Sequence, residues 1–244
     1  MSCARGPGCA GWDDAGDGRV IAEEFDEATP VRLSREVIID TFLKIVQEED
    51  GESPTLRRLG EELGADPTAL YRYFRAKDDL VAAVADRVLG EVVDGFEPTG
   101  EWRRDIREVA RRLRLAYLRH SRVLLPLAAS PHTLENGPVL AEHLMRALRS
   151  IDLPPEEAAL AFEAIEDYVI GAGSLDALSN GAAQRWQPLW ASASPDEFPN
   201  VVATAHLMYR DVDAAFDYGL ELMLDALAAR TAQDSEGQDR PAVR

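Results

Sequence analysis

Apolar residues recur every three or four positions along most of this chain, which is the period of an α-helix. The spacing predicts helices over residues 33–49, 55–63, 67–74, 78–94, 101–121, 138–151, 154–178, 200–209 and 211–230, with a shorter apolar helix near Pro126 and Pro131. No stretch shows the alternation of apolar and polar residues that is typical of a strand. The pattern therefore predicts an all-α fold.

The polar stretches between these helices predict how the chain is divided. Residues 1–31 are rich in Gly, Asp and Glu and contain few large apolar residues, so we interpret them as a disordered acidic tail. Residues 179–200, which include Trp186 and Trp190, are expected to form a loop. Residues 231–244 are polar and are expected to form a second disordered tail.

A break in the helical pattern predicts two domains. Gly95, Pro98 and Gly100 interrupt the pattern where one helix ends and the next begins. We therefore expect a first domain at residues 32–96 and a second at residues 97–230.

Residues 53–77 combine two short helices with a tight turn between them. Thr55 can cap the first helix with its hydroxyl, and Gly64 stands where the chain must turn, as a residue that tolerates a left-handed conformation. Asp66 can cap the second helix, whose first turn contains Pro67. One side of that helix is polar and carries Thr68, Tyr71, Arg72 and Tyr73. This arrangement is a helix-turn-helix, which fits the major groove of DNA.

The same region carries a family resemblance. Its specific part is the pattern Leu-Gly-x-x-x-x-Ala-Leu-Tyr-x-Tyr-Phe-x-x-Lys-x-x-Leu, which runs from Leu63 to Leu80. With the flanking helices, residues 33–89 resemble the DNA-binding domain of the TetR family of transcriptional regulators, and residues 216–227 resemble the last helix of its tetracycline-repressor-like subgroup. The resemblance implies an N-terminal three-helix helix-turn-helix DNA-binding domain and a C-terminal helical domain that binds a ligand and dimerises.

The resemblance implies DNA contacts along both helices of the motif. Arg57 is placed to contact a base or a phosphate, and Arg72 is the candidate for direct base readout, because a guanidinium can pair bidentately with guanine. Thr55 can offer its hydroxyl and N–H to a phosphate while it caps its helix. Thr68 can touch a thymine methyl group or a phosphate.

Three further residues complete this set. Tyr71 and Tyr73 are placed to hold phosphates through their hydroxyls, although packing in the core is an equal alternative for Tyr73. Lys77 resembles the phosphate-binding lysine of the family. Ala69 stands where some relatives carry a hydroxyl, so that contact does not carry over and the operator sequence does not follow from the motif.

The overall charge is unfavourable for a DNA-binding protein, but its distribution is not. The net charge is −18, whereas phosphate neutralisation requires Lys and Arg. Between Thr55 and Lys77 the basic residues outnumber the acidic ones: Arg57, Arg58, Arg72, Arg75 and Lys77 stand against Glu61, Glu62 and Asp66. The acidic remainder would repel DNA from other faces.

Cysteine usage and hydropathy bear on the compartment. Cys3 and Cys9 are expected to be free thiols in a reducing cytoplasm. No apolar run is long enough to span a membrane, and we see no signal peptide.

The C-terminal helices suggest a homodimer. The helix at residues 154–178 and the last helix are apolar on more than one face, so each can contact the domain core on one side and a second copy on the other. A dimer also fits a palindromic site read by two recognition helices one DNA turn apart. A monomeric bundle with a large core is the alternative.

Candidate effector contacts are the polar or aromatic side chains on these apolar helices, namely Tyr117, His120, Phe162 and Glu166. His120 falls near pocket residues of tetracycline-repressor-like proteins. A surface or core role is the alternative for each side chain. Because relatives bind bulky apolar or aromatic molecules, the resemblance implies a mostly apolar cavity and an effector of that class.

Other motifs give no site. Residues 13–24 resemble an EF-hand loop, but Ala15 replaces the third calcium ligand and the preceding Gly-rich residues cannot form the entering helix. The four His residues lack zinc-site spacing, and no Ser stands in a nucleophile elbow. We expect no metal, no cofactor and no enzymatic activity.

Together these patterns predict a ligand-responsive transcriptional regulator. Its partners would be a double-stranded DNA operator, a second copy of the chain and a small-molecule effector, whose binding would release a homodimeric repressor from DNA. The alternative is a helical protein-interaction module that does not bind DNA, in which the groove-reading helices contact a protein.

Overall fold

A computed structural model describes residues 32–48, 54–129, 134–179 and 185–238. The regular elements in these ranges are helices, so the predicted all-α fold is confirmed. The expected tail at residues 1–31, with Cys3, Cys9 and the calcium-loop-like segment, lies outside the described residues. Among the helices that are described, none is both long enough and apolar enough to cross a membrane.

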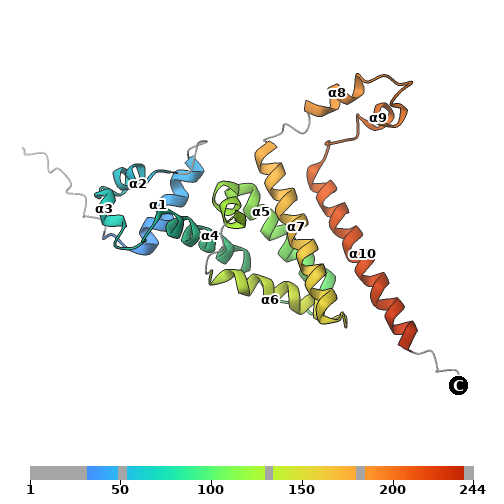
Figure 1. The fold of residues 1–244 in the computed structure, drawn as a ribbon, viewed down its shortest axis with the longest axis horizontal. Coiled ribbons are helices and arrows are strands. Elements are labelled where there is room, and N and C mark those ends of the chain that lie inside the picture. The colour runs from blue at the N-terminus through green and yellow to red at the C-terminus, as the bar shows by residue number, and fades with distance from the viewer. Residues whose placement is uncertain (1–31, 49–53, 130–133, 180–184, 239–244) are drawn as a thin grey trace, which may run out of the picture. The chain divides into compact units, whose positions relative to one another are not determined.

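Four helices form the N-terminal part: α1 (Arg35–Glu48), α2 (Leu56–Leu63), α3 (Pro67–Leu70) and α4 (Lys77–Val93) (Figure 1). Their places agree with the prediction, but α3 ends before the predicted residue 74. Beyond Leu70 the N–H groups of Tyr71, Arg72 and Tyr73 bond to carbonyls three residues back, so the chain continues as a tighter turn. This turn brings Phe74 into the core, where it is buried.

Six helices follow: α5 (Trp102–Ala129), α6 (Asn136–Arg149), α7 (Pro155–Ser179), α8 (Trp186–Ala191), α9 (Pro199–Thr204) and α10 (Val212–Gln238). Three predictions were wrong here. The helix expected at residues 200–209 is α9, which ends at Thr204. The expected loop at residues 179–200 contains α8, and α10 continues through Thr231 to Gln238, into the expected C-terminal tail. Propensity alone could not place either, because Pro188 and Gly237 both argue against a helix at those positions.

Helix α5 is longer than predicted and kinked. At His120 the backbone has φ −131° and ψ 28°, which is not helical, and the helix resumes beyond it to Ala129. The predicted end at Ser121 therefore falls beside the kink. Pro126 lies inside the second stretch rather than between two separate helices.

One apolar core runs through both halves of the chain. Leu59, Leu70 and Leu80 from the N-terminal helices belong to the same cluster of buried side chains as Ile106 and Ile165 from the C-terminal helices. Helix α4 connects the halves, because it packs against α1 on one side and against α5 and α6 on the other. The predicted boundary at residue 96 thus falls in a loop across which the core continues.

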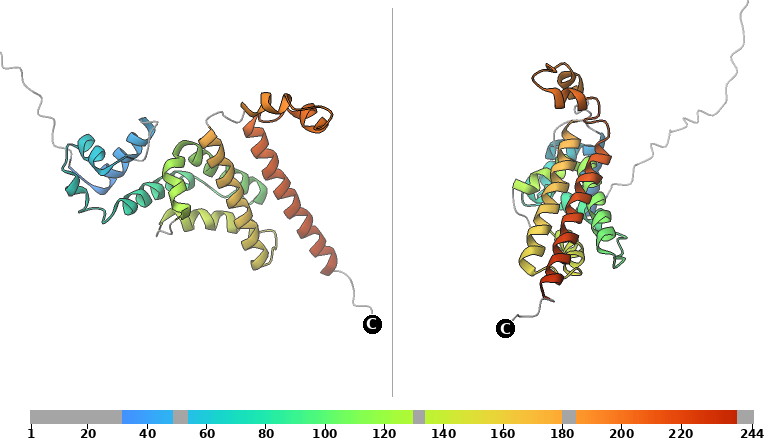
Figure 2. Two further views of the ribbon diagram at one scale, coloured as in Figure 1. Left: turned by 45° about the horizontal axis from the view of Figure 1, so that its top comes forward. Right: turned by 90° about the vertical axis from the view of Figure 1, so that its right-hand side faces the viewer.

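Two specific contacts hold these helices together. The Asp86 carboxylate of α4 accepts from the backbone N–H of Asn136 (2.9 Å) and from its side-chain amide (3.1 Å), so α4 caps the start of α6. Helices α5 and α7 approach closely at Gly173, where a Cβ atom would lie 2.8 Å from Cβ of Tyr117. Helix α10 runs alongside α7 (Figure 2).

Candidate nucleic-acid interface

Helix α2 begins and ends as the sequence predicts. The Thr55 hydroxyl accepts from the backbone N–H of Arg58 (3.1 Å), which leaves the hydroxyl proton free for a phosphate. Gly64 ends the helix in the left-handed conformation, with φ 61°. The Arg57 side chain is 83% exposed and lies 3.9 Å from Glu61, a distance that marks a weak surface ion pair.

At the start of α3, Asp66 organises Thr68. The Asp66 carboxylate accepts from the backbone N–H of Thr68 (2.7 Å) and from its hydroxyl (2.6 Å). These two hydrogen bonds lower the pKa of Asp66. Because the Thr68 hydroxyl has only one proton, it cannot also donate to a phosphate in this arrangement. Of the two predicted contacts for Thr68, the geometry favours the one between its methyl group and a thymine.

The turn after α3 presents one tyrosine outward and the other inward. The Tyr71 side chain is 54% exposed, and its neighbour Arg72 is exposed as well. Tyr73 is half-buried, and its hydroxyl donates to the backbone carbonyl of Leu33 at 2.7 Å. Of the two roles open to Tyr73, the structure therefore favours packing over a phosphate contact.

Arg35 supports this turn, and sequence reasoning did not single it out. Its guanidinium lies 4.3 Å from the centre of the Phe74 ring and donates to the Tyr73 carbonyl at 3.1 Å. Nothing in the local sequence distinguishes Arg35 from a solvated arginine at a helix start, because its partners lie 38 and 39 residues away.

Two basic residues of this region, Arg72 and Lys77, have no partner side chain among the described residues. Arg72 is exposed and Lys77 is partly exposed, and the described part of the chain shows no hydrogen bond or ion pair of either side chain with another, so both charges can meet phosphates or bases. Lys77 begins α4, directly after the turn that carries Tyr71. The caps at Thr55 and Asp66 thus hold a surface on which Thr55, Arg57, Thr68, Tyr71, Arg72 and Lys77 are available to a ligand.

The predicted effector contacts lie on α5 and α7. Tyr117 is buried, and burial together with the nearby charge of Glu166 raises its pKa to about 12. Burial raises the pKa of Glu166 as well, with a smaller contribution from Asp167 and Glu163. The structure therefore brings Tyr117 and Glu166 together across the two helices, and Phe162 packs partly buried one turn away.

His120 has different surroundings. It is buried at the α5 kink, its Nδ1 atom has no hydrogen-bond partner among the described residues, and burial lowers its pKa. The charge of Glu91, on α4, opposes that lowering. His120 on α5 thus lies close to α4, the helix that follows the helix-turn-helix.

Comparison with known families agrees with this geometry. Residues 38–84 match the family described as bacterial regulatory proteins, tetR family, and residues 95–231 match the tetracyclin repressor-like, C-terminal domain. The second match alone spans more than half of the chain. This chain belongs to the TetR family. TetR-family proteins are transcriptional regulators, so the predicted family, the DNA-binding helix-turn-helix and the assignment as a regulator rather than an enzyme are confirmed.

Individual TetR-family proteins are similar to this chain over most of their length. The transcriptional repressor Rv1353c of Mycobacterium tuberculosis is 28% identical over 230 residues, which cover 87% of each chain. ActR of Streptomyces coelicolor, solved in complex with (S)-DNPA, is 30% identical with a TM-score of 0.70, over 82% of this chain and 99% of ActR. BioQ of Mycobacterium smegmatis, solved with its natural double-stranded DNA operator, is 27% identical with a TM-score of 0.58, over 81% of this chain and 99% of BioQ.

Proposed function

We propose that this TetR-family chain is a homodimeric repressor that binds an operator and is released from it by a small-molecule effector. The observation that carries the proposal is the exposed surface of α2, α3 and the following turn, where basic and hydroxyl side chains stand on two capped helices. Structures of relatives support the proposal, because BioQ has been solved with operator DNA and ActR with (S)-DNPA and with actinorhodin.

In the proposed DNA complex the side chains divide by task. Arg72 reads a base edge, and the Thr68 methyl group contacts a thymine. Lys77, Tyr71 and the free hydroxyl proton of Thr55 hold phosphates, which fixes the orientation without reading sequence. Arg57 leaves its weak pair with Glu61 to join a phosphate or a base.

Exposed apolar side chains support the homodimer. Thirteen large apolar side chains are exposed in the described residues, and ten of them lie on or between α7 and α10: Leu160, Leu175, Leu178, Trp186, Leu189, Phe198, Leu207, Tyr209, Tyr218 and Leu222. Those on α7 and α10, two helices that contact each other, favour an interaction surface. We assign it to a second copy of the chain, because a pair of recognition helices is what a palindromic operator requires.

In the proposed effector site, Tyr117 and His120 on α5 and Phe162 and Glu166 on α7 contact a mostly apolar or aromatic molecule. The route to the DNA passes through α4, which carries Glu91 beside His120 and Asp86 at the cap of α6. An effector that binds more tightly to one arrangement of α4 shifts the spacing of the two recognition helices and lowers operator affinity by the same free energy.

The DNA-binding half of the proposal is tested by selecting binding sites from random DNA and measuring affinity by fluorescence anisotropy at two salt concentrations. Arg72→Ala and Tyr71→Ala should each weaken binding, while Arg104→Ala, which removes an exposed charge from α5, serves as the matched control. No selected site, or equal losses in all three variants, would contradict DNA binding by this surface and favour the protein-interaction alternative.

The effector half is tested on the same selected site. Actinorhodin is the first probe, because ActR binds it. Compounds that bind the wild-type protein should lower its DNA affinity, and Glu166→Gln should change that response without changing affinity in the absence of compound. Binding of a compound with no change in DNA affinity would contradict release.

A further inference from the structure

Helix α10 carries two rows of side chains that each repeat every four residues. The first is apolar and buried, and consists of Phe216, Leu220 and Leu224. The second is acidic, and consists of Asp213, Asp217, Glu221 and Asp225. A four-residue repeat keeps each row on one side of the helix.

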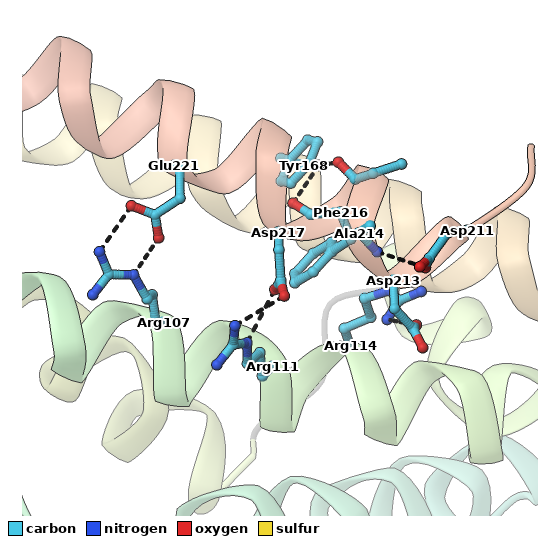
Figure 3. A network of polar contacts seen from close by, with 11 residues as sticks. Arg107, Arg111, Arg114, Tyr168, Asp211, Asp213, Ala214, Phe216, Asp217 and Glu221 are labelled. Atoms are coloured by element: carbon cyan, nitrogen blue, oxygen red, sulfur yellow. Dashed lines mark hydrogen bonds and ion pairs between the residues drawn. The ribbon is translucent and has the colours of Figure 1, made fainter. Parts of the chain in front are cut away.

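The acidic row pairs with arginines of α5, in the opposite chain direction (Figure 3). Arg103 donates to Asp225 (2.7 Å), Arg107 binds both carboxylate oxygens of Glu221, Arg111 binds both of Asp217 (3.0 and 2.9 Å), and Arg114 donates to Asp213 (2.7 Å). We call these four pairs the ladder.

The apolar row alone does not determine where α10 lies along its neighbours. If α10 slid by four residues, about 6 Å, the three buried positions would receive Leu220, Leu224 and Ala228, or in the other direction Val212, Phe216 and Leu220. Both sets are apolar. The hydrophobic effect is not directional, so it distinguishes these registers only weakly.

The ladder does distinguish them. A slide in one direction leaves Arg103 facing Ala229, and a slide in the other leaves the buried Arg114 facing Tyr209. Only the observed register gives every arginine of the ladder a carboxylate. The pair of Arg114 with Asp213 is the most costly of the four to lose, because the Arg114 side chain is 9% exposed and also donates to Asp176 of α7 at 2.7 Å.

The close approach of Tyr168 on α7 to Gly219 on α10, which we call the notch, adds a steric constraint. The Tyr168 hydroxyl donates to the carbonyl of Phe216 (2.9 Å), and its ring stacks on the Phe216 ring at 5.5 Å. A Cβ atom on Gly219 would lie 2.2 Å from the Tyr168 oxygen and 2.7 Å from Cζ. A slide by four residues would place Ala215 or Met223 at this point, and either side chain would collide with Tyr168.

We propose that the notch and the ladder lock α10 in one register, and that this register presents Tyr218 and Leu222 to a second copy of the chain. These two side chains are 69% and 53% exposed and belong to the apolar surface described above. The contact of Tyr218 and Leu222 with a second copy rests on the proposed homodimer. The arginines and Gly219 are positioning residues, which act on the interface through the placement of α10.

The test compares Gly219→Ala with Gly171→Ala, which adds the same methyl group on α7 where nothing lies within 4 Å. Sedimentation measures the dimer dissociation constant, and hydrogen exchange measures protection of the α10 amides. Gly219→Ala should raise the dissociation constant roughly tenfold or more and speed exchange along α10. Gly171→Ala should leave both close to wild type.

A second comparison guards against simple misfolding. Arg107→Glu should weaken the dimer, and the double variant Arg107→Glu with Glu221→Arg should recover it, because the reversed pair meets only in the observed register. Wild-type behaviour of Gly219→Ala in both assays, or no recovery in the double variant, would overturn the lock. A wild-type protein that stays monomeric would overturn the homodimer and the contact of Tyr218 and Leu222 with a second copy. Hydrogen exchange would still decide whether α10 is locked in one register.

Discussion

Arg111 and Arg114 occupy neighbouring rungs of the same ladder but differ in burial, so the same substitution should have very different effects. The Arg114 side chain is 9% exposed, and its partner Asp176 is 22% exposed. Arg111 and its partner Asp217 are 54% and 42% exposed. Replacing each arginine with Met keeps a flexible apolar chain of similar length and removes the charge.

The magnitudes follow from solvation. Arg114→Met removes a guanidinium that is only 9% exposed and pairs with both Asp176 and Asp213, which should cost about 3 kcal/mol, the lower end for a broken buried pair. The guanidinium also lies 4.7 Å from the centre of the Phe216 ring, a contact that Met does not replace. Arg111→Met should cost about 0.5 kcal/mol, since both of its charges remain hydrated.

Urea unfolding followed by circular dichroism measures the difference, with all proteins at one concentration because a dimer's stability depends on it. With a denaturant dependence of about 3 kcal/mol/M, Arg114→Met should lower the midpoint by about 1 M and Arg111→Met by about 0.2 M. Equal midpoints for the two variants would refute the reasoning that burial, rather than the number of ion pairs, decides the strength of a rung.

Three further predictions concern other parts of the chain. Burial by itself raises the pKa of Asp105, but hydrogen bonds from Thr99 and Gly100 outweigh burial, so the pKa is lowered. The carboxylate therefore stabilises the fold at pH values above its unfolded pKa, and this stabilisation is lost as pH falls through the folded pKa. Asp105→Asn should lower the free energy of unfolding by about 2 kcal/mol at pH 7 and by less in acid, as measured by urea unfolding at both pH values. Gly60→Ala places a Cβ atom 2.8 Å from the Ala65 carbonyl, and should cost about 1–3 kcal/mol with loss of DNA binding; an unchanged melting temperature would contradict the tight turn. Lys77→Ala should weaken binding to all DNA sequences alike and lower the salt slope by about one unit per half-site, whereas a change in sequence preference, measured on a panel of selected sites, would show that Lys77 reads bases.

Much of the fold follows from short-range features of the sequence. The helical period, the caps at Thr55 and Asp66 and the left-handed Gly64 act over a few residues, so their effects can be read along the chain and the structure has them where they were predicted. The family pattern from Leu63 to Leu80 is local for the same reason. It identifies the regulator even though the net charge is unfavourable for binding DNA.

The site is less accessible to sequence reasoning. Tyr71 and Tyr73 are two residues apart in one motif, yet the first is exposed and the second donates to Leu33, 40 residues away. The Thr68 hydroxyl, by contrast, is occupied by Asp66 only two residues away, a local contact that follows from the predicted cap. Side-chain direction depends on what the rest of the chain places nearby, which periodicity does not contain.

By itself, then, the sequence determined most of the helices, the helix-turn-helix and the family, because each depends on interactions between residues close in the chain. Only the tertiary structure decided the kink at His120, the continuation of α10 and the pairing of α5 with α10. The arginines at 103–114 and the acids at 213–225 are about a hundred residues apart. Each row alone resembles a solvated helix face, and the ladder exists only because folding brings the two faces together.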